Sequence, residues 1–520
     1  MYLRGFVMCT TILIGKKASY DDSTLVARIE DSSAGMFKSK KFIVVEPKDQ
    51  PIHYKSVRTD CEIELPKNPM RYTCLPNVKK WRGVWGACGV NEKNVSMTAT
   101  ETITTNERVL GADPLVEFEP GIIKKGGIGE EDFVVITLPY INSAKEGVER
   151  LGALIEKYGT YESNGIAFQD VDSIWWFETI GGHHWIARRV PDEVYVVMPN
   201  QFGLDYFDFE DAYGAKEEFM CSSDLKEFVE ENFLDLSTDI SLEKLLDDFE
   251  EGFDYDEDED YKEPFNPRVA FGSHSDADHT YNTPRAWVML RYFNPNTFDW
   301  DGEDAEFKPH SDNLPWCMIP EKKITIEDVK YIMSNHYQGT PYDPYLKSGD
   351  LSQKGKFRPI GINRNDVLAL VQIRPYMPEE IRSIEWLSFG SNVFNAIVPY
   401  YANITKTPEY LENTTLTPST DNFYWINRII GALCDAHFPS TASHVERYQN
   451  AVQSKCREFL NKYDKEFLKK KSKIKNVHEF LEKANDEITD FVKDQTNDLL
   501  DKTLFTASCE MKNGFSRSDA

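Results

Sequence analysis

The chain has 520 residues and a formal net charge of −27, with 41% hydrophobic and 13% aromatic residues. This composition is typical of a well-cored globular protein that needs no disulfide or metal ion to stay folded. The negative charge repels phosphate groups, which argues against nucleic acid or an anionic membrane surface as a partner. No stretch reaches about 18 consecutive apolar residues, so the sequence predicts no membrane-spanning helix.

The first two hundred residues have the pattern of strands with inserted helices. Residues 144–158 predict a helix, because Ser143 and Glu146 form a capping-box pattern and Gly159 follows the last apolar position. Asn164 and Gly165 predict a tight turn. We expect strands over residues 9–14, 23–28, 42–46, 84–98, 174–178 and 193–198.

The middle of the chain mixes both types of element. We expect helices over 222–234 and 240–250, while the apolar run 286–293 fits either a strand or a buried helix. Residues 247–263 form a dense acidic run, which is interpreted as a solvated loop. A calcium loop fits it poorly, because Glu259 stands where such a loop needs glycine and Phe265 stands where it needs glutamate.

The last hundred residues differ from the rest of the chain. Apolar side chains recur at helical spacing over about 444–469 and again over about 476–500, which predicts two long amphipathic helices. The polar end, 510–520, is expected to fray. This helical section is a candidate surface for assembly into a homo-oligomer.

The cysteines and the first residues bear on the compartment. Nine cysteines, without CxxC spacing, fit a reducing environment, so we expect a cytoplasmic protein. The opening segment, MYLRGFVM, is too short for a signal peptide.

Cys9 directly follows Met8, and this position gives it a chemical meaning. Either an alternative start at Met8 or self-cleavage of residues 1–8 would leave Cys9 as the first residue. A thiol of ordinary pKa is mostly protonated at neutral pH and needs a base. The α-amino group of a free N-terminal cysteine, with a pKa near ~8, can serve as that base. The alternative interpretation is a small buried hydrophobe.

Arg28 and Asp31 follow on the predicted returning strand. They are interpreted either as a surface ion pair or as part of the same site. In a site, Arg28 would set the electrostatics around the thiolate. Asp31 would accept hydrogen bonds from the α-ammonium group or from the substrate.

The segment CTTILIGKKASYDDSTLVARIEDS resembles the start of the dipeptidase A family of bacterial peptidases, within a wider group that includes bile salt hydrolases and penicillin V acylases. Further blocks resemble the family in the same order over about residues 1–430. They are GVNEKNVSMTATET (89–102), GGHHWIARRVPDEVYVVMPNQF (181–202), YNTPRAW (281–287) and HYQGTPYD (336–343).

The resemblance assigns roles residue by residue. Cys9 matches the nucleophile, with Arg28 and Asp31 as the charged residues beside it. Asn200 matches an asparagine whose side-chain N–H contributes to the oxyanion hole, and Arg285 matches a second active-site arginine.

One position departs from the acylase pattern. An asparagine follows the Asn-Glu pair by about ten residues in those relatives, whereas Glu101 stands there after Asn91-Glu92 in this chain. A carboxylate cannot donate to an oxyanion, but it suits the ammonium group of a dipeptide. The second oxyanion donor is then expected to be a backbone N–H or Asn91. Asn91 and Glu101 are therefore the predicted substrate-binding residues.

The fold that the resemblance implies is an α+β, four-layer αββα sandwich of the N-terminal-nucleophile hydrolases. We expect residues 1–8 to be a propeptide or an upstream start, 9–430 to be the hydrolase domain and 431–520 to be a helical C-terminal section.

Other candidate sites are weaker. His183 and His184 lack a second ligand pair at zinc spacing and are interpreted as structural, so no metal is expected. His336 and Asp343 are interpreted as structural or pocket-lining. No phosphate-binding glycine pattern occurs, so no cofactor is expected.

The function that this resemblance implies is hydrolysis of dipeptides with a free amino terminus through a Cys9 thioester. One alternative is an amidase acting on N-acyl amino acids, as in the bile salt hydrolase and penicillin V acylase group. Another is a non-hydrolytic regulatory module, because secernin proteins also resemble this family.

Overall fold

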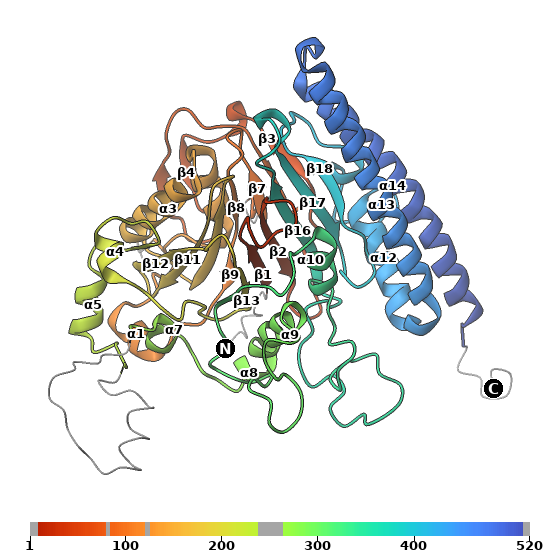
Figure 1. Ribbon diagram of the computed structural model, residues 1–520. Helices are drawn as coiled ribbons and strands as arrows, with labels where there is room; N and C mark the ends of the chain where they lie inside the picture. Colours follow the sequence, from red (N-terminus) through yellow and green to blue (C-terminus); the bar gives the residue numbers. More distant parts are fainter. Residues whose placement is uncertain (1–8, 80–83, 120–124, 238–263, 513–520) are drawn as a thin grey trace.

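The computed structural model describes residues 9–79, 84–119, 125–237 and 264–512 (Figure 1). The predicted helix 240–250 and the acidic run 247–263 lie outside the described residues. Among the helices of the described ranges, none combines the length and apolar character needed to cross a bilayer.

The apolar run that begins at Cys9 forms the middle of a large antiparallel sheet. Its β-branched residues favour an extended strand with hydrogen bonds on both edges. The sheet has seven strands, in the order β15 (Cys317–Met318), β13 (Tyr195–Met198), β1 (Cys9–Ile14), β2 (Thr24–Asp31), β16 (Asn365–Ile373), β17 (Ser383–Phe389) and β18 (Val398–Tyr401).

A second antiparallel sheet lies beside the first (Figure 1). Its order is β14 (Phe219–Cys221), β12 (His184–Arg189), β11 (Ile174–Ile180), β10 (Asn164–Gln169), β8 (Ser96–Thr98) and β7 (Cys88–Val90), and β9 (Glu101–Thr102) also pairs with β10. Two small pairs accompany the sheets: β3 (Ile43–Val45) with β6 (Tyr72–Cys74), and β4 (His53–Lys55) with β5 (Glu62–Glu64).

Helices connect these strands and end the chain. They are α1 (Glu107–Ala112), α2 (Glu130–Thr137), α3 (Ala144–Tyr158), α4 (Phe209–Tyr213), α5 (Leu225–Glu231), α7 (Pro267–Phe271), α8 (Asp278–Tyr281), α9 (Thr283–Phe293), α10 (Ile326–Ile332), α11 (Glu409–Glu412), α12 (Phe423–Ala436), α13 (Phe438–Lys470) and α14 (Val477–Cys509). Short 3-10 turns cover Pro47–Asp49, Leu138–Tyr140, Glu379–Ile381 and Lys471–Lys473.

The buried side chains of β1 separate into two cores, because successive residues of a strand point to opposite faces. Leu13 packs in one cluster with Trp176 of the second sheet. Ile12 packs in another cluster, which includes Met289 of α9 and Ile488 of α14. The outer face of the second sheet contributes Phe168 to a third cluster, with side chains of α2 and α3.

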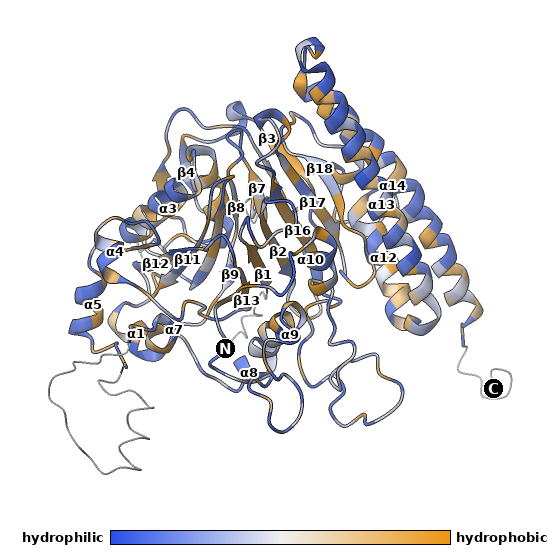
Figure 2. Cartoon of the chain, in the orientation of Figure 1, coloured by the Kyte–Doolittle hydropathy of each residue, from blue (hydrophilic) through white to orange (hydrophobic). Residues whose placement is uncertain are grey.

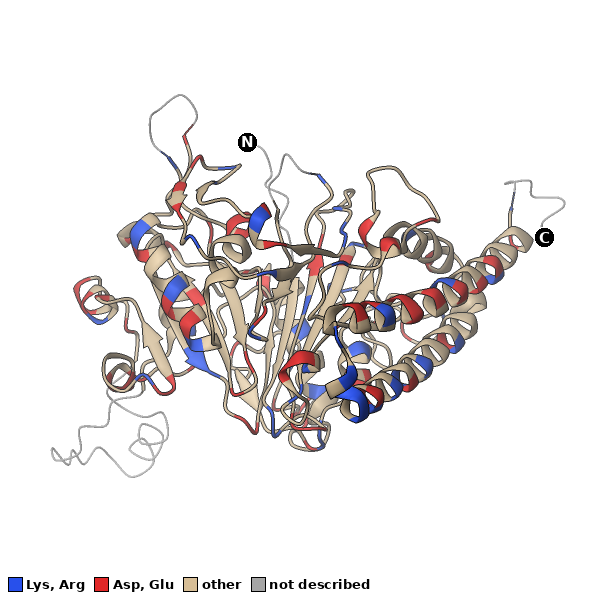
Figure 3. Ribbon diagram, turned by 90° about the horizontal axis from the view of Figure 1, so that it is seen from above, with Lys and Arg blue, Asp and Glu red and all other residues tan. Residues whose placement is uncertain are grey.

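Two long helices, α13 and α14, pack along the outer side of the first sheet at β18. Figure 2 shows hydrophobic and hydrophilic residues alternating along both helices. Figure 3 shows acidic and basic residues interspersed on them. The predicted helical tail is confirmed, and both helices are longer than predicted. Helix α12 begins at Phe423 and crosses the expected boundary at residues 430 and 431.

The predicted turn at Asn164-Gly165 is wrong, because both residues belong to β10. A side chain at position 165 would collide with the ring of Trp176, which is 2.3 Å from an ideal Cβ. The glycine is therefore needed for the close packing of an aromatic ring. The Asn-Gly pair therefore looks like a turn signal, although the glycine is there to make room for the Trp176 ring.

Other predicted elements are confirmed with changes. Helix α3 starts and ends where expected, and the Ser143 hydroxyl accepts the Glu146 N–H. The run 286–293 is the buried helix α9, whose buried residues lie on all sides and leave no clear periodicity. The expected strand 84–98 is broken into β7 and β8 by a turn at Asn94, which has a φ of 57°. The expected helix 222–234 shortens to α5.

Candidate active site

Cys9 is the first residue of β1, between β13 and β2. Its Cα lies opposite that of Glu30, and Thr11 lies opposite Arg28. In an antiparallel pair, opposite residues share a face of the sheet, and so do residues two apart. The hairpin therefore brings Cys9, Thr11, Arg28 and Glu30 to one face.

Arg28 contacts the Cys9 sulfur directly. Its Nη2 lies 2.9 Å from Cys9 Sγ and 3.0 Å from an oxygen of Glu130 at the start of α2. Its Nε donates to the Thr100 carbonyl oxygen at 2.9 Å. The guanidinium group is fully buried, so these contacts fix it against the sulfur.

The buried charges around this pair set its protonation. Burial raises the pKa of the Cys9 thiol well above its usual value, and the Arg28 charge opposes that effect. Burial alone would lower the pKa of Arg28, but the negative charges of Cys9, Glu30 and Glu130 raise it. Despite its burial, Glu30 has a pKa lowered to about 2, because Lys40 and Arg28 lie beside it. Arg28 is thus held as a cation next to the sulfur.

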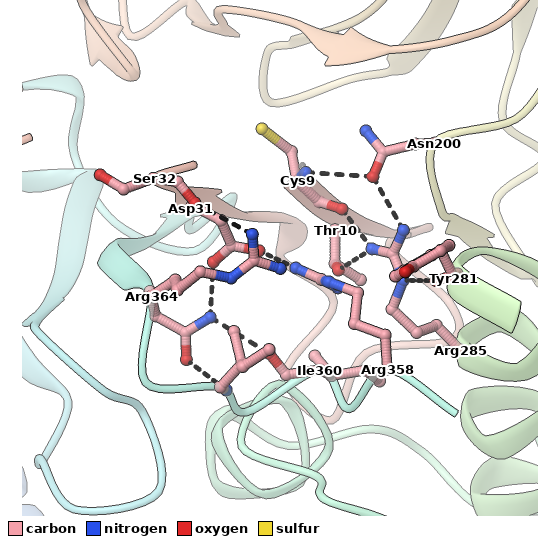
Figure 4. A network of polar contacts seen from close by, with 12 residues as sticks. Cys9, Thr10, Asp31, Ser32, Asn200, Tyr281, Arg285, Arg358, Ile360 and Arg364 are labelled. Carbon is pink, nitrogen blue, oxygen red and sulfur yellow. Dashed lines mark hydrogen bonds and ion pairs between the residues drawn. The ribbon is translucent and has the colours of Figure 1, made fainter. Parts of the chain in front are cut away.

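Asn200 and Arg285 meet on the other side of Cys9 (Figure 4). Asn200 Oδ1 accepts the backbone N–H of Cys9 at 3.2 Å and an Arg285 N–H at 2.8 Å. Arg285 also donates to the Cys9 carbonyl oxygen and to the Thr10 hydroxyl. The predicted donor of Asn200, Nδ2, lies 2.9 Å from the Thr102 carbonyl oxygen.

Asp31 lies at the end of β2 beside this cluster. Its carboxylate accepts hydrogen bonds from Arg358 and, at 2.6 Å, from Asn365 Nδ2. Both Asp31 and Arg358 are buried. Figure 4 shows the Arg358, Arg364 and Arg285 side chains converging on the region of Asp31 and Thr10.

Glu101 lies over the same face as the sulfur. The Thr11 hydroxyl donates to Glu101 Oε2 at 2.7 Å, while Oε1 has no hydrogen-bond partner within the described part of the chain. Burial raises the pKa of Glu101 more than Arg285 and Arg28 lower it. A buried acceptor without a partner is expensive, so it is suited to receive a donor from a ligand.

Asn91 is not joined to this cluster by any hydrogen bond found among the described residues. Its Nδ2 donates to the carbonyl oxygens of Leu138 and Ile141, and its Oδ1 accepts from the backbone at residues 93 and 95. Both of its side-chain N–H groups are therefore used in holding a turn.

The histidine candidates form carboxylate pairs elsewhere. Asp113 accepts from the ring nitrogens of His183 at 3.1 Å and His184 at 2.7 Å. His336 Nδ1 lies 2.9 Å from Asp343 Oδ1, and its ring packs against Tyr345 and Phe438.

Several residues of the cluster had no signal in the sequence. Glu130, Arg358 and Asn365 lie 121 to 356 positions from Cys9, and only the folded chain brings them together. Glu30 was detectable, since alternation along β2 puts it on the face of Arg28. The carbonyl oxygens of Thr100 and Thr102 belong to one of the quoted family-like blocks, but a backbone acceptor carries no sequence signature.

Cys9, the Arg28 guanidinium at its sulfur and Asn200 at its backbone N–H have the residue types of a cysteine-type hydrolase site. The model of peptidase family C69 matches residues 8–451, and the chain belongs to this family. It is 50% identical to "Dipeptidase" of Bifidobacterium longum (strain NCC 2705), over 98% of this chain and 99% of that one. It is 49% identical to "Probable dipeptidase A" of Streptococcus pyogenes serotype M18 (strain MGAS8232), over 98% of both. "Dipeptidase A" of Lactobacillus helveticus is 42% identical over 95% of both.

Proposed function

We propose that this protein hydrolyses dipeptides with a free amino terminus, using Cys9 as the nucleophile. The observation that carries the proposal is the contact between Arg28 and Cys9 Sγ within a C69 peptidase chain. Relatives named dipeptidase match nearly the whole chain, which supports the substrate class.

The first step is attack of the Cys9 sulfur on the peptide carbonyl carbon. The free α-amino group of Cys9 takes the thiol proton, and Arg28 stabilises the sulfur anion. An Asn200 N–H and a backbone N–H stabilise the oxyanion, a contribution of ~3 kcal/mol for each donor in other enzymes. The C–N bond then breaks, and the α-ammonium group passes its proton to the leaving amino acid. Water hydrolyses the thioester and restores the thiol.

Exposure of the α-amino group requires a chain that begins at Cys9. We propose that residues 1–8 are removed, by autoprocessing as a propeptide, or that translation starts at Met8. The family model begins at residue 8, which fits a start at Met8. Asn200 Oδ1, 3.2 Å from the Cys9 nitrogen, would then accept from the free amine.

For the amino end of the substrate we propose Glu101. Its Oε1 has no hydrogen-bond partner among the residues that the structure describes, and its Oε2 accepts the Thr11 hydroxyl on the face that carries the sulfur. An ammonium group there would form a buried ion pair. An N-acyl group offers no charge to Glu101, which favours dipeptides over the amidase alternative. The intact polar cluster around Cys9 argues for hydrolysis and against a purely regulatory module.

For the fold we propose the four-layer αββα arrangement of N-terminal-nucleophile hydrolases. Three buried clusters support it: one between the two sheets, one joining the first sheet to α9 and α14, and one joining the second sheet to α3.

We also propose a cytoplasmic location, supported by nine cysteines that are all free.

The first experiment is the intact mass of protein expressed from Met1, followed by a chain started at Met8. We expect both to begin at Cys9 and to cleave free-amino dipeptides without added metal. Cys9→Ala, made in the chain started at Met8, should lower kcat by about 1000-fold or more. Cys509→Ala, at an exposed cysteine near the end of α14, is the control and should keep full activity. Substantial turnover by Cys9→Ala would refute the mechanism, and cleavage of N-acyl amino acids in preference to dipeptides would favour the amidase.

A further inference from the structure

Arg285 is a fully buried cation whose N–H groups all have acceptors. Its Nε donates to the Tyr281 carbonyl oxygen at 2.7 Å, and its Nη1 donates to two oxygens at the start of β1. Its Nη2 donates to Asn200 Oδ1 and to Asn282 Oδ1, both at 2.8 Å. A guanidinium group has donors only, so an amide that faces it must present its oxygen.

The Asn200 side-chain amide has two orientations of nearly equal shape, and its partners select between them. Its Oδ1 accepts from the Cys9 nitrogen at 3.2 Å and from Arg285, and its Nδ2 donates to the Thr102 carbonyl oxygen at 2.9 Å. Figure 4 shows Nδ2 turned away from Arg285. A rotated amide would set its N–H groups against those of Arg285 and its oxygen against that of Thr102.

The Cys9 nitrogen does not select the orientation in the proposed mechanism. An α-amino group that acts as a base has an unshared electron pair, and this pair accepts a hydrogen bond. A rotated Asn200 would donate to that pair, block the base and turn its own N–H groups away from the oxyanion. The productive orientation therefore depends on Arg285 and on the Thr102 carbonyl oxygen.

Asn282 precedes α9 and holds the Nη2 end of Arg285. Its Nδ2 donates to Asp278 Oδ1 at 2.7 Å and to the Asn200 carbonyl oxygen at 3.1 Å, which leaves its Oδ1 to face Arg285. An ionised carboxylate accepts hydrogen bonds and donates none, so Asp278 fixes this orientation of the Asn282 amide. Asn282 and Asp278 are both buried.

Asp278 is held by the loop before α8. Its Oδ2 accepts the hydroxyls of Ser273 and Ser275, each at 2.8 Å, and the Ser275 backbone N–H at 3.1 Å. These hydrogen bonds replace the water that the buried carboxylate has lost. Asp278 is therefore a fixed acceptor at the end of a chain of contacts that reaches Cys9.

We propose that Asp278 and Asn282 are positioning residues, which fix the orientation of the Asn200 amide through Arg285 and keep its Nδ2 turned toward the oxyanion. The inference rests on the proposed function, in which Asn200 is an oxyanion donor. Among the described residues, no side-chain hydrogen bond joins Asn282 to Cys9. The oxyanion forms only as the sulfur adds to the carbonyl group, so a misoriented amide lowers kcat and leaves KM unchanged.

The test measures kcat and KM for L-alanyl-L-alanine with Asn282→Ala, made in the chain started at Met8. We expect kcat to fall about 10-fold, part of the roughly 100-fold or larger loss that follows removal of an oxyanion donor. KM should change by less than about twofold. Asn294→Ala, which should alter neither constant, is the matched control. Asn294 is also buried, lies at the other end of α9 and makes three side-chain hydrogen bonds, with Tyr195, Thr297 and Ile319.

A double-mutant comparison shows whether the effect passes through Asn200. Asn200→Ala alone should lower kcat about 100-fold or more. In that background Asn282→Ala should cause no further loss, because no amide remains to be oriented, and a further 10-fold loss would overturn the proposal. Should Asn200→Ala keep its activity, the proposed oxyanion donor is wrong and the inference falls with it. A fully active Asn282→Ala beside an inactive Asn200→Ala would overturn the inference alone.

Asp278→Asn is the second variant, should Asn282→Ala fail to fold. It keeps the size of the side chain, but an amide presents either its oxygen or its N–H groups, so Asn282 loses its fixed orientation. We expect kcat to fall about threefold at an unchanged KM, and to fall no further in the Asn200→Ala background. An unchanged kcat, or a rise in KM as large as the fall in kcat, would count against the proposal.

Discussion

Glu101 is the residue at which recognition of the substrate's amino group can be tested. Glu101→Gln keeps the shape but removes the charge, so kcat/KM for free-amino dipeptides should fall about 10- to 100-fold, as for loss of a charged hydrogen bond. An N-formyl dipeptide, which carries no ammonium group, should be cleaved no more slowly by the variant than by the unaltered enzyme. An equal loss on both substrates would contradict the proposed role.

The pH dependence of binding follows from the same carboxyl group. Burial raises its pKa, so much of Glu101 is protonated in the free enzyme near neutral pH. The ammonium group of a dipeptide stays charged below about pH 8. Binding it requires ionised Glu101, so the KM should decrease as the pH rises from about 6 to 7.5. Glu101→Gln has no proton to lose at this position, and its KM should be flat over that interval.

At this scale the sequence predicts what lies on one hairpin. Cys9, Arg28 and Asp31 are close in the chain, and strand alternation brings the first two together. Arg358 could not be found, because one arginine among many has no pattern until a loop more than 300 residues away is folded against β2. Asn91 is the opposite case, because its residue type suits an oxyanion hole but its side-chain N–H groups bind the carbonyl oxygens of Leu138 and Ile141 instead.

Among the elements, α13 is tied to the first sheet by one buried carboxylate. The Asp464 carboxylate accepts hydrogen bonds from both terminal nitrogens of Arg374, at 2.5 and 3.1 Å, and from the Tyr401 hydroxyl at 2.8 Å. Asp464→Ala leaves a buried guanidinium unpaired, so we expect a loss of ~3–5 kcal/mol, seen as a lower Tm. Glu466→Ala, on the same helix, breaks only a surface pair with Lys470 and should cost less than ~1 kcal/mol. Equal Tm values for the two variants would show that this ion pair does not anchor the helix.

Helices with one exposed face could be predicted from the sequence, whereas elements whose form depends on contacts with other elements could not. Helices α3, α13 and α14 expose one face to solvent and bury the other, so their sequences carry a helical period. Helix α9 is buried on nearly all sides, which erases that period. Gly165 was misread because its cause, the ring of Trp176, lies on another strand.

For the whole molecule, one core connects the first sheet to the end of the chain. Ile12 and Leu370 of the sheet belong to the same buried cluster as Val452 of α13 and Ile488 of α14. A chain that stops after residue 436 would expose that side of the cluster. We expect it to be insoluble or to unfold well below the Tm of the full chain. A soluble, active product of this truncation would instead support a hydrolase domain that folds without α13 and α14.

The place of β1 has a consequence for how the enzyme fails on heating. Cys9 begins a strand that is hydrogen-bonded to neighbours on both edges and buried on both faces. Such a segment opens only when the protein unfolds as a whole, unlike a loop that frays locally. The amide protons of β1 should therefore exchange with solvent no faster than global unfolding permits. Thermal inactivation and loss of the fold should be one event, without an inactive intermediate that keeps its sheets.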